Sequence, residues 1–252
     1  MSSFRGSVAL VTGGGTGAGR AAALAFAREE ARVCVVGTRE GPLQETVQAI
    51  RRRGGEAISV VADVTVESDV ERAVQGALKA LGRLDVAFNN AGTEGEFGAL
   101  ADLTEATWNR TFAVNAKGVW LSMKHEIKAI IASGGKGAIV NNSTDLTEVG
   151  IPGTAIYTAS KAAVDALTRV GASDYGPKGI RVNAVNPGNI EGTPMTSRLW
   201  DAQSVQRFKD ANPLRKIATA EDVAEAAVWL CSSKAGHING QTLNIDGGLT
   251  LQ

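Results

Sequence analysis

Seven short apolar runs alternate with segments of helical periodicity along the chain, and this alternation limits the possible folds more than any other feature. The runs lack the hydrophobic–polar alternation of half-exposed strands, as expected for strands that are covered on both faces. They are Val8–Val11, Arg32–Val36, Ala57–Val61, Leu84–Phe88, Ala138–Asn141, Ile180–Val185 and Thr242–Ile245.

The segments between the runs carry apolar residues at three- and four-residue spacing, which indicates amphipathic helices. In one of them, Val70, Val74 and Leu81 lie on a single helix face. The predicted helices are Gly17–Glu30, Pro42–Arg53, Glu67–Leu81, Glu105–Ala132, Ala155–Tyr175 and Ala220–Cys231. Strand–helix alternation of this kind predicts an α/β fold: one doubly wound, Rossmann-like parallel sheet with helices on both faces.

One domain is expected over residues 1–252, because no Pro- or Ser-rich linker and no internal repeat divides the chain. Lys plus Arg and Asp plus Glu number 26 each, so no charge excess favours a nucleic-acid partner. The two cysteines, Cys34 and Cys231, lie in apolar segments, and the two histidines, His125 and His237, are far apart. No metal site is therefore expected.

A cytoplasmic protein is expected. The first apolar run is short and ends in glycines, unlike the apolar core of a signal peptide. No stretch approaches the roughly 20 apolar residues of a membrane span, and buried free thiols suit a reducing compartment.

A glycine-rich turn, Thr12-Gly13-Gly14-Gly15-Thr16-Gly17-Ala18-Gly19, joins the first predicted strand to the first predicted helix. Residues without a β-carbon allow a tight turn and close approach of a phosphate, and a helix N-terminus attracts anions. Gly13, Thr16, Gly17 and Gly19 are therefore predicted to bind a dinucleotide. The spacing differs from Gly-x-Gly-x-x-Gly, and the alternative is a flexible turn of an unrelated α/β protein.

The end of the second strand favours NADP(H) over NAD(H). NAD sites place an acid there for the ribose diol, whereas Val36 is followed by Gly37-Thr38-Arg39, with no acid before Glu40. Arg39 could pair with a 2′-phosphate, with Thr38 beside it. NAD(H) stays possible, because Arg39 could equally be a solvated loop residue.

Tyr157 and Lys161 are four residues apart on a predicted helix, so their side chains share one face. A positive charge about 4 Å from the phenol favours the phenolate by roughly 4 kcal/mol at an effective dielectric of about 20. The pair is therefore expected to lower the phenol pKa toward neutrality, although Tyr-x-x-x-Lys alone is a weak motif.

Six motifs follow one another in a fixed order and span nearly the whole chain. They are the glycine turn, Asn89-Asn90-Ala91-Gly92, Asn115, the Tyr157/Lys161 pair, Asn186-Pro187-Gly188 and Asp246-Gly247-Gly248. The chain resembles the short-chain dehydrogenase/reductase family. Asn115, with Gly118 close behind, is a poor helix former, which by itself predicts a local break in that helix. The resemblance implies that Tyr157 is the general acid/base, that Lys161 tunes it and binds the nicotinamide ribose, and that Asn115 bends its helix to complete a proton relay. It further implies cofactor contacts at Asp63, Val64, Asn90, Ala91, Gly92, Pro187, Gly188 and Ile190, and a homotetramer.

The family's substrate-binding serine lies thirteen residues before the tyrosine, and here that position is Thr144. Threonine keeps a hydroxyl that can donate to a substrate oxygen. Ser143 is the alternative, and a third possibility is that both hydroxyls only satisfy backbone groups.

The expected reaction is hydride transfer between NADP(H) and a ketone or secondary alcohol. A segment at about 188–213 lacks a strand and is predicted to cover the substrate. With the loops Thr93–Ala101 and Asp145–Ile151 it offers mainly apolar walls, which favour an apolar substrate. The alternative is that one of the loop carboxylates points inward and binds hydroxyls or an amine, although charged loop residues are usually solvated: Glu94, Glu96, Asp145 or Glu148. The alternatives are an NAD-dependent polyol or sugar dehydrogenase of the same family and a non-catalytic nucleotide sensor. Reduction of an activated double bond is disfavoured, because relatives with that activity lengthen the tyrosine–lysine spacing.

Overall fold

The computed structural model describes residues 3–251, and its centre is a seven-stranded parallel sheet in the order β3-β2-β1-β4-β5-β6-β7. The strands are β1 Val8–Thr12, β2 Arg32–Gly37, β3 Ala57–Val61, β4 Val86–Asn89, β5 Gly137–Asn142, β6 Ile180–Pro187 and β7 Thr242–Ile245. All seven predicted strands are present, with ends shifted by two residues or fewer. The predicted Rossmann-like fold class is confirmed.

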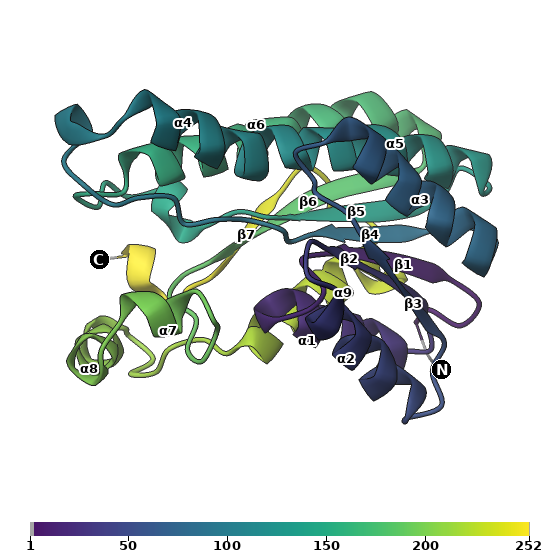
Figure 1. Cartoon of the computed structure of the whole chain (residues 1–252), viewed down its shortest axis with the longest axis horizontal. Coiled ribbons are helices and arrows are strands. Elements are labelled where there is room, and N and C mark those ends of the chain that lie inside the picture. Colours follow the sequence, from purple (N-terminus) through teal and green to yellow (C-terminus); the bar gives the residue numbers. More distant parts are fainter. Residues whose placement is uncertain (1–2, 252) are drawn as a thin grey trace.

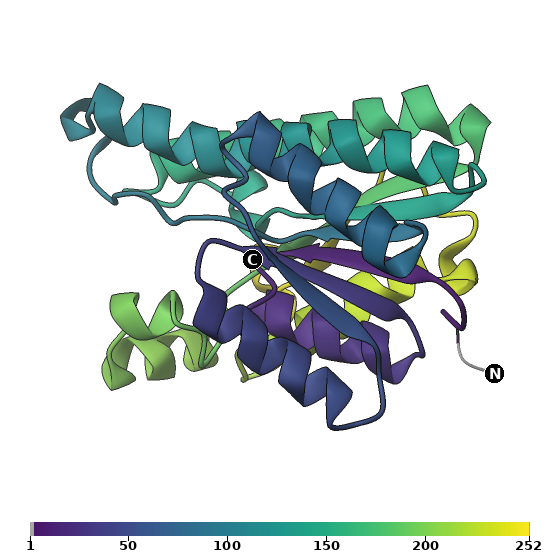
Figure 2. The same ribbon diagram turned by 45° about the vertical axis from the view of Figure 1, so that its right-hand side comes forward.

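Helices cover both faces of the sheet (Figure 1, Figure 2). One layer holds α3 Glu67–Leu81, α4 Glu105–Phe112, α5 Gly118–Ala132 and α6 Ala155–Tyr175. The other holds α1 Gly17–Arg28, α2 Glu40–Arg51 and α9 Ala220–Cys231. Two apolar clusters, one on each side of the sheet, form the core. No helix within residues 3–251 is both long and apolar enough to cross a membrane.

The helix ends follow local chemistry. In α3 the buried side chains include Val70, Val74 and Leu81, and Gly82 ends the helix in the left-handed region with φ +84°. At α9, Thr219 and Asp222 form a reciprocal capping box. Arg181 of β6 donates to the carbonyls of Leu230, Cys231 and Ser232 at the other end of α9, which satisfies carbonyls that a helix end leaves without partners.

The predicted helix Glu105–Ala132 is not continuous, because a π turn over Ala113–Lys117 separates α4 from α5. The turn contains Asn115, whose poor helix propensity predicted a local break. That prediction is confirmed.

The strand order reverses between β1 and β4. Strands on one side of this point continue to β3 and those on the other side to β7. Ligands of open parallel sheets bind at such a point, beyond the carboxyl ends of the strands. The glycine turn follows β1 and Asn90 follows β4, so both lie there.

Candidate active site

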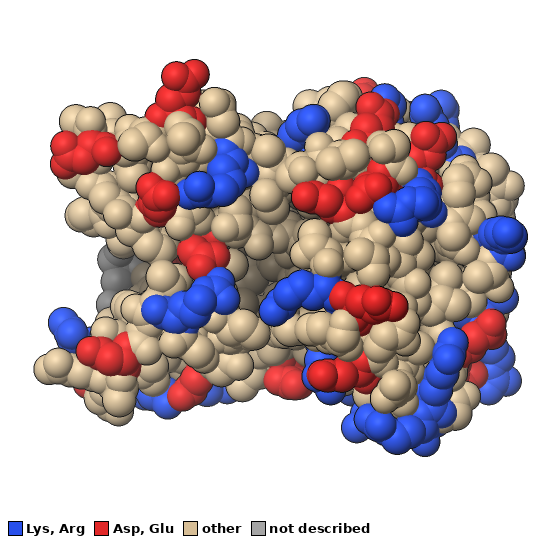
Figure 3. All heavy atoms as spheres, viewed as in Figure 1, with Lys and Arg blue, Asp and Glu red and all other residues tan. Residues whose placement is uncertain are grey.

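A cleft of about 1010 Å³ lies beyond the carboxyl ends of the strands, and Figure 3 shows the molecule hollowed there. Nearly all the predicted site residues line this cleft: Gly13, Thr16, Gly17, Thr38, Arg39, Asp63, Val64, Asn90, Ala91, Gly92, Ser143, Thr144, Tyr157, Lys161, Pro187, Gly188 and Ile190. Gly19 and Asn115 do not line the cleft; both are buried behind the residues that form its wall.

The turn between β1 and α1 needs its glycines. Gly13 and Gly17 have φ of +64° and +51°, which side chains with a β-carbon rarely adopt. A β-carbon on Gly19 would lie 2.3 Å from the carbonyl oxygen of Gly13. The first turn of α1 carries no acidic residue, so its positive dipole end meets no competing carboxylate. This cradle suits the pyrophosphate of a dinucleotide.

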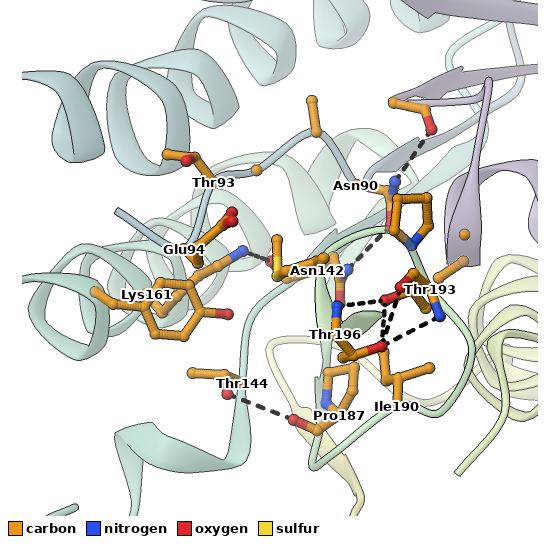
Figure 4. Close-up of a pocket in the computed structure, with 18 of the residues that line it drawn as sticks. Asn90, Thr93, Glu94, Asn142, Thr144, Lys161, Pro187, Ile190, Thr193 and Thr196 are labelled. Atoms are coloured by element: carbon orange, nitrogen blue, oxygen red, sulfur yellow. Dashed lines mark hydrogen bonds between the residues drawn. The ribbon is translucent and has the colours of Figure 1, made fainter. Parts of the chain in front are cut away.

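Asn90 braces the sheet beside the turn. Its backbone N–H donates to Thr12 Oγ1 at 3.0 Å, and its Nδ2 donates to the Thr12 carbonyl at 3.2 Å. Its Oδ1 accepts from Asn142 Nδ2 at 3.0 Å. The three strands β1, β4 and β5 are thereby joined at their carboxyl ends. Figure 4 shows the bond between Asn90 and Asn142.

The opposite end of the cleft lies at the ends of β2 and β3. Arg39 is exposed there and forms no ion pair with any described residue, whereas Glu40, the first residue of α2, does not line the cleft. Asp63 accepts from the Thr65 N–H at 2.9 Å, which fixes the loop after β3. Val64 packs so closely against the start of α5 that a β-carbon on Gly118 would lie 2.8 Å from Val64 Cγ2.

Asn115 is fully buried and ties the loop after β4 to α6. Its Oδ1 accepts from the Thr93 N–H at 2.8 Å, and its Nδ2 donates to the Thr93 carbonyl at 2.9 Å and to Ser160 Oγ at 3.0 Å. The π turn makes these contacts possible by directing the side chain between two elements. Asn115 thus positions the floor of the cleft beside Gly92 rather than entering the cleft itself.

Lys161 projects from α6 into the cleft wall. Its Nζ donates to the Asn142 carbonyl at 2.6 Å (Figure 4) and lies 6.0 Å from the centre of the Tyr157 ring. Burial lowers the pKa of Lys161 to about 8, while Asp165 opposes this change. Such an ammonium is still mainly protonated at neutral pH.

The expected lowering of the Tyr157 pKa is wrong for this structure. Burial raises the pKa of Tyr157 to about 12, against the opposing effect of a hydrogen bond with Thr144, and the charges of Asp145 and Glu94 raise it further. The Lys161 ammonium faces a backbone carbonyl, so it does not offset the loss of solvent around the phenol. Tyr157 is a neutral phenol at neutral pH.

Thr144, rather than Ser143, faces the phenol. The Thr144 hydroxyl interacts with Tyr157 and lies 3.4 Å from the Pro187 carbonyl (Figure 4). Ser143 Oγ donates to the Lys161 carbonyl at 3.2 Å and interacts with Asp165, so it is directed at the body of α6. The geometry therefore agrees with Thr144 in the position of the substrate-binding hydroxyl.

The segment at about 188–213 lies beyond the carboxyl ends of the strands, and we call it the covering segment. It contains α7 Thr196–Leu199 and α8 Ala202–Ala211, and its one isolated bridge pairs Ile190 with Ala218. It contributes no strand to the sheet, as predicted. Its apolar lining joins that of two loops: Phe97, Leu146, Val149, Ile151, Met195, Leu199, Trp200 and Phe208.

Several residues that line the cleft were not predicted from the sequence. Thr193 and Thr196 hydrogen-bond to each other beside the glycine turn, and Asn142 holds both Lys161 and Asn90. Arg198 of α7 forms an ion pair of 2.7 Å with Glu94 in the loop after β4. Asn142 could have been found from its place at the end of a predicted strand; no local pattern marks Arg198.

Comparisons with known proteins agree over nearly the whole chain. A family model described as Enoyl-(Acyl carrier protein) reductase matches residues 13–250. The cyclohexanol dehydrogenase of Acinetobacter sp. (strain SE19) is 36% identical over 247 residues, covering 98% of this chain and 96% of that protein. The crystal structure of levodione reductase superposes with a TM-score of 0.95 at 33% identity, covering 98% and 99% of the two chains. NAD⁺-bound xylitol dehydrogenase gives a TM-score of 0.93 at 30% identity, covering 97% and 99%.

Proposed function

The chain belongs to the short-chain dehydrogenase/reductase family, of the ketone reductase and alcohol dehydrogenase type, and from this membership we propose that it transfers hydride between NADP(H) and an apolar ketone or secondary alcohol. It is an oxidoreductase that uses a nicotinamide cofactor and acts on CH–OH groups. The observation that carries the proposal is the convergence of the Thr144 hydroxyl and the Tyr157 phenol in one cleft with the glycine turn.

The proposed roles follow from the positions of the side chains. The cofactor supplies or accepts the hydride when it is bound. The Thr144 hydroxyl donates to the substrate oxygen and holds it beside Tyr157. Tyr157 gives its proton to that oxygen during reduction and takes one from the alcohol during oxidation. Lys161 contributes a buried positive charge to the wall of the cleft. Asn115 fixes the loop at Thr93 through its buried hydrogen bonds.

The protonation state of Tyr157 in this structure suits proton donation, the step that reduction needs. A neutral phenol is the form that donates a proton, and the raised pKa of Tyr157, about 12, keeps it in that form across the physiological range. Oxidation needs the phenolate, so its rate is expected to rise with pH.

NADP(H) is proposed as the preferred cofactor because exposed Arg39 lies at the cleft beside Thr38, and no carboxylate at the end of β2 lines the cleft. An Arg39→Leu variant is expected to weaken NADPH binding by about 1.5–3 kcal/mol, the range for hydrogen bonds to charged groups, and to leave NADH binding nearly unchanged. Fluorescence titration of both cofactors measures this.

Arg53→Leu is the matched control, because Arg53 is an exposed arginine that does not line the cleft. Equal losses of NADPH and NADH affinity in Arg39→Leu would show that Arg39 does not distinguish the phosphate.

The apolar walls support a hydrocarbon-bearing substrate, because burial contributes about 25 cal/mol per Å² of apolar surface and few polar groups could select a free sugar. The second candidate is an NAD-dependent polyol or sugar dehydrogenase. It is favoured by the likeness to xylitol dehydrogenase, which is bound to NAD⁺ in its crystal structure.

A substrate panel separates the two candidates. Cyclic and aryl-alkyl ketones with NADPH, and xylitol and hexoses with NAD⁺, are compared by absorbance at 340 nm under saturating cofactor. A higher kcat/KM for the ketones is expected, and a clear preference for xylitol or sugars would establish the second candidate.

Other functions have less support. The enoyl reductase description of the family model raises double-bond reduction, but the four-residue Tyr157–Lys161 spacing favours carbonyl chemistry. A non-catalytic sensor would not need Asn115, Tyr157 and Lys161 together. We also propose a homotetramer and a cytoplasmic location, the latter because Cys34 and Cys231 are buried free thiols.

A further inference from the structure

We infer that Asp145 selects substrates with a hydrogen-bond donor, a hydroxyl or an ammonium, on the carbon next to the one that is oxidised or reduced. This inference rests on the proposed function and narrows its substrate class: the rest of the substrate is apolar, and one neighbouring donor is recognised.

Asp145 lies within the reaction centre. It follows Thr144 directly, lines the cleft and is only 3% exposed. Its Oδ1 lies 3.3 Å from Thr144 Oγ1, and its charge acts on the Tyr157 phenol. Its Oδ2 borders Gly188, where an added β-carbon would lie 3.0 Å from that oxygen. The carboxylate therefore reaches the space beside the expected substrate oxygen.

No described residue supplies a cation to Asp145. The charges that act on it come from Asp246 and Glu148, and both are negative. The other carboxylates nearby have partners: Glu94 pairs with Arg198, Glu148 accepts from Asn244, and Asp246 accepts from Thr250. Burial together with these charges raises the pKa of Asp145 to about 6, so the group is mainly ionised at neutral pH.

The reaction withdraws the side-chain donor that Asp145 has. In the proposed mechanism the Thr144 hydroxyl turns its proton to the substrate oxygen, so it can no longer donate to Asp145 Oδ1. A buried carboxylate that loses a donor is destabilised. A hydroxyl or ammonium on the carbon next to the reacting one lies close to Asp145 Oδ1. It can replace the Thr144 hydroxyl as the donor to that oxygen. The backbone N–H of Leu146 remains a donor to the carboxylate, but the apolar side chains of Leu146 and Val149 offer no replacement for the hydroxyl.

The test uses four cyclohexane alcohols that differ only in the neighbouring group: cyclohexanol, trans-1,2-cyclohexanediol, trans-2-aminocyclohexanol and trans-2-methoxycyclohexanol. The methyl ether retains the oxygen of the diol's second hydroxyl and lacks its proton. Oxidation is followed at 340 nm with saturating NADP⁺ for the native enzyme and for Asp145→Asn, Asp145→Leu and Glu148→Gln. Glu148→Gln is the matched control, because it removes a nearby charge from an exposed residue that does not line the cleft.

For the native enzyme, kcat/KM for the diol or the amine is expected to exceed that for the ether at least tenfold. The ratio of kcat/KM for the diol or the amine to kcat/KM for the ether falls to about one in Asp145→Leu. The same ratio is unchanged in Glu148→Gln. In Asp145→Asn, which keeps the size of the side chain, an amine preference is lost and a hydroxyl preference is reduced less.

A native enzyme that oxidises cyclohexanol with no preference for the donor-bearing alcohols would overturn the inference and leave the proposed function standing. The same holds if the preference persists in Asp145→Asn and Asp145→Leu, with folding checked by circular dichroism. Failure to oxidise any of the four alcohols with either NADP⁺ or NAD⁺ would overturn the inference together with the proposed function.

Discussion

At the residue scale, Tyr157 shows that burial can outweigh an attraction that sequence spacing suggests. The four-residue spacing correctly placed Lys161 on the same helix, but the orientation of its ammonium depends on Asn142, which lies at the end of strand β5. The pKa of Tyr157 is therefore raised to about 12 instead of lowered. Sequence spacing could predict which residues share the cleft, but not the sign of this pKa change.

Tyr157→Phe keeps the ring and removes the proton that the proposed mechanism transfers. Turnover is expected to fall by several orders of magnitude, while cofactor affinity stays nearly unchanged. Steady-state kinetics and a fluorescence titration of NADPH measure the two effects. Activity within tenfold of the native enzyme would show that another group moves the proton.

Thr144→Val deletes a hydroxyl with little change of shape, and Thr144→Ser retains the hydroxyl. The valine variant is expected to lose most ketone reduction and the serine variant to keep it, because the hydroxyl holds the substrate oxygen. Ser143→Ala is the control, since Ser143 donates to the Lys161 carbonyl. If Ser143→Ala were the more damaging change in kcat/KM, Ser143 would be the substrate-binding residue.

At the scale of elements, a buried polar chain connects the sheet to the helices above it. Asn89 of β4 donates to Asn141 Oδ1 of β5 and to Glu126 Oε2 of α5, both at 3.0 Å, and Asn141 donates to Thr168 Oγ1 of α6 at 2.9 Å. Glu126 is fully buried, and neither its Oε1 nor Asn89 Oδ1 has a hydrogen-bond partner among the described residues. Burial raises the pKa of Glu126 to about 8, so the folded protein holds it protonated at neutral pH.

Glu126→Gln tests the energetic consequence. Because the pKa of Glu126 is higher in the folded state, its proton stabilises the fold fully below the unfolded-state pKa of about 4.3 and progressively less as pH rises through about 8. Between these values the group should steepen the fall of the unfolding free energy by about 1.4 kcal/mol per pH unit.

The glutamine variant does not titrate and should show a shallower pH dependence in urea unfolding from pH 5 to 8. Glu148→Gln, at an exposed site, should match the native slope. Parallel curves for the native protein and Glu126→Gln would contradict the assignment.

Most element boundaries could be predicted because hydrophobic periodicity is local. Glu67–Leu81, Ala155–Tyr175 and Ala220–Cys231 agree residue for residue with α3, α6 and α9. The division of Glu105–Ala132 was anticipated only as a break at Asn115, since the geometry of a π turn depends on its partners Thr93 and Ser160. The path of the covering segment could not be predicted, because its contacts join residues far apart in sequence.

At the scale of the whole molecule, α4, α5 and α6 lie in one layer over the sheet (Figure 1), and each of them exposes a large apolar side chain. Trp108, Trp120 and Val170 are 45%, 47% and 58% exposed. Exposed apolar surface of this kind is typical of interaction sites, and most oligomers of identical chains have closed symmetry. These faces support the proposed tetramer.

Trp120→Glu should therefore lower the assembly state, because it introduces a charge into an apolar interface. Light scattering after size-exclusion chromatography should give the mass of a tetramer for the native chain and a smaller species for the variant. Val61→Glu is the control, as Val61 is exposed on β3 at the far edge of the sheet. A native monomer would disprove the tetramer.

The ion pair between Glu94 and Arg198 connects the two sides of the cleft. Its strength determines how firmly the mouth of the cleft is kept closed during a turnover. The side chain of Arg198 is 59% exposed and that of Glu94 is 17% exposed. Because water reaches the pair from the arginine side, it contributes on the order of 1 kcal/mol, about fivefold in an equilibrium constant. Loop motions of this kind take microseconds to milliseconds, whereas an ordinary turnover lasts about 1 ms to 1 s. A contact worth about fivefold can keep the mouth of the cleft closed for most of the time, but it cannot hold it closed against a motion that fits within one turnover.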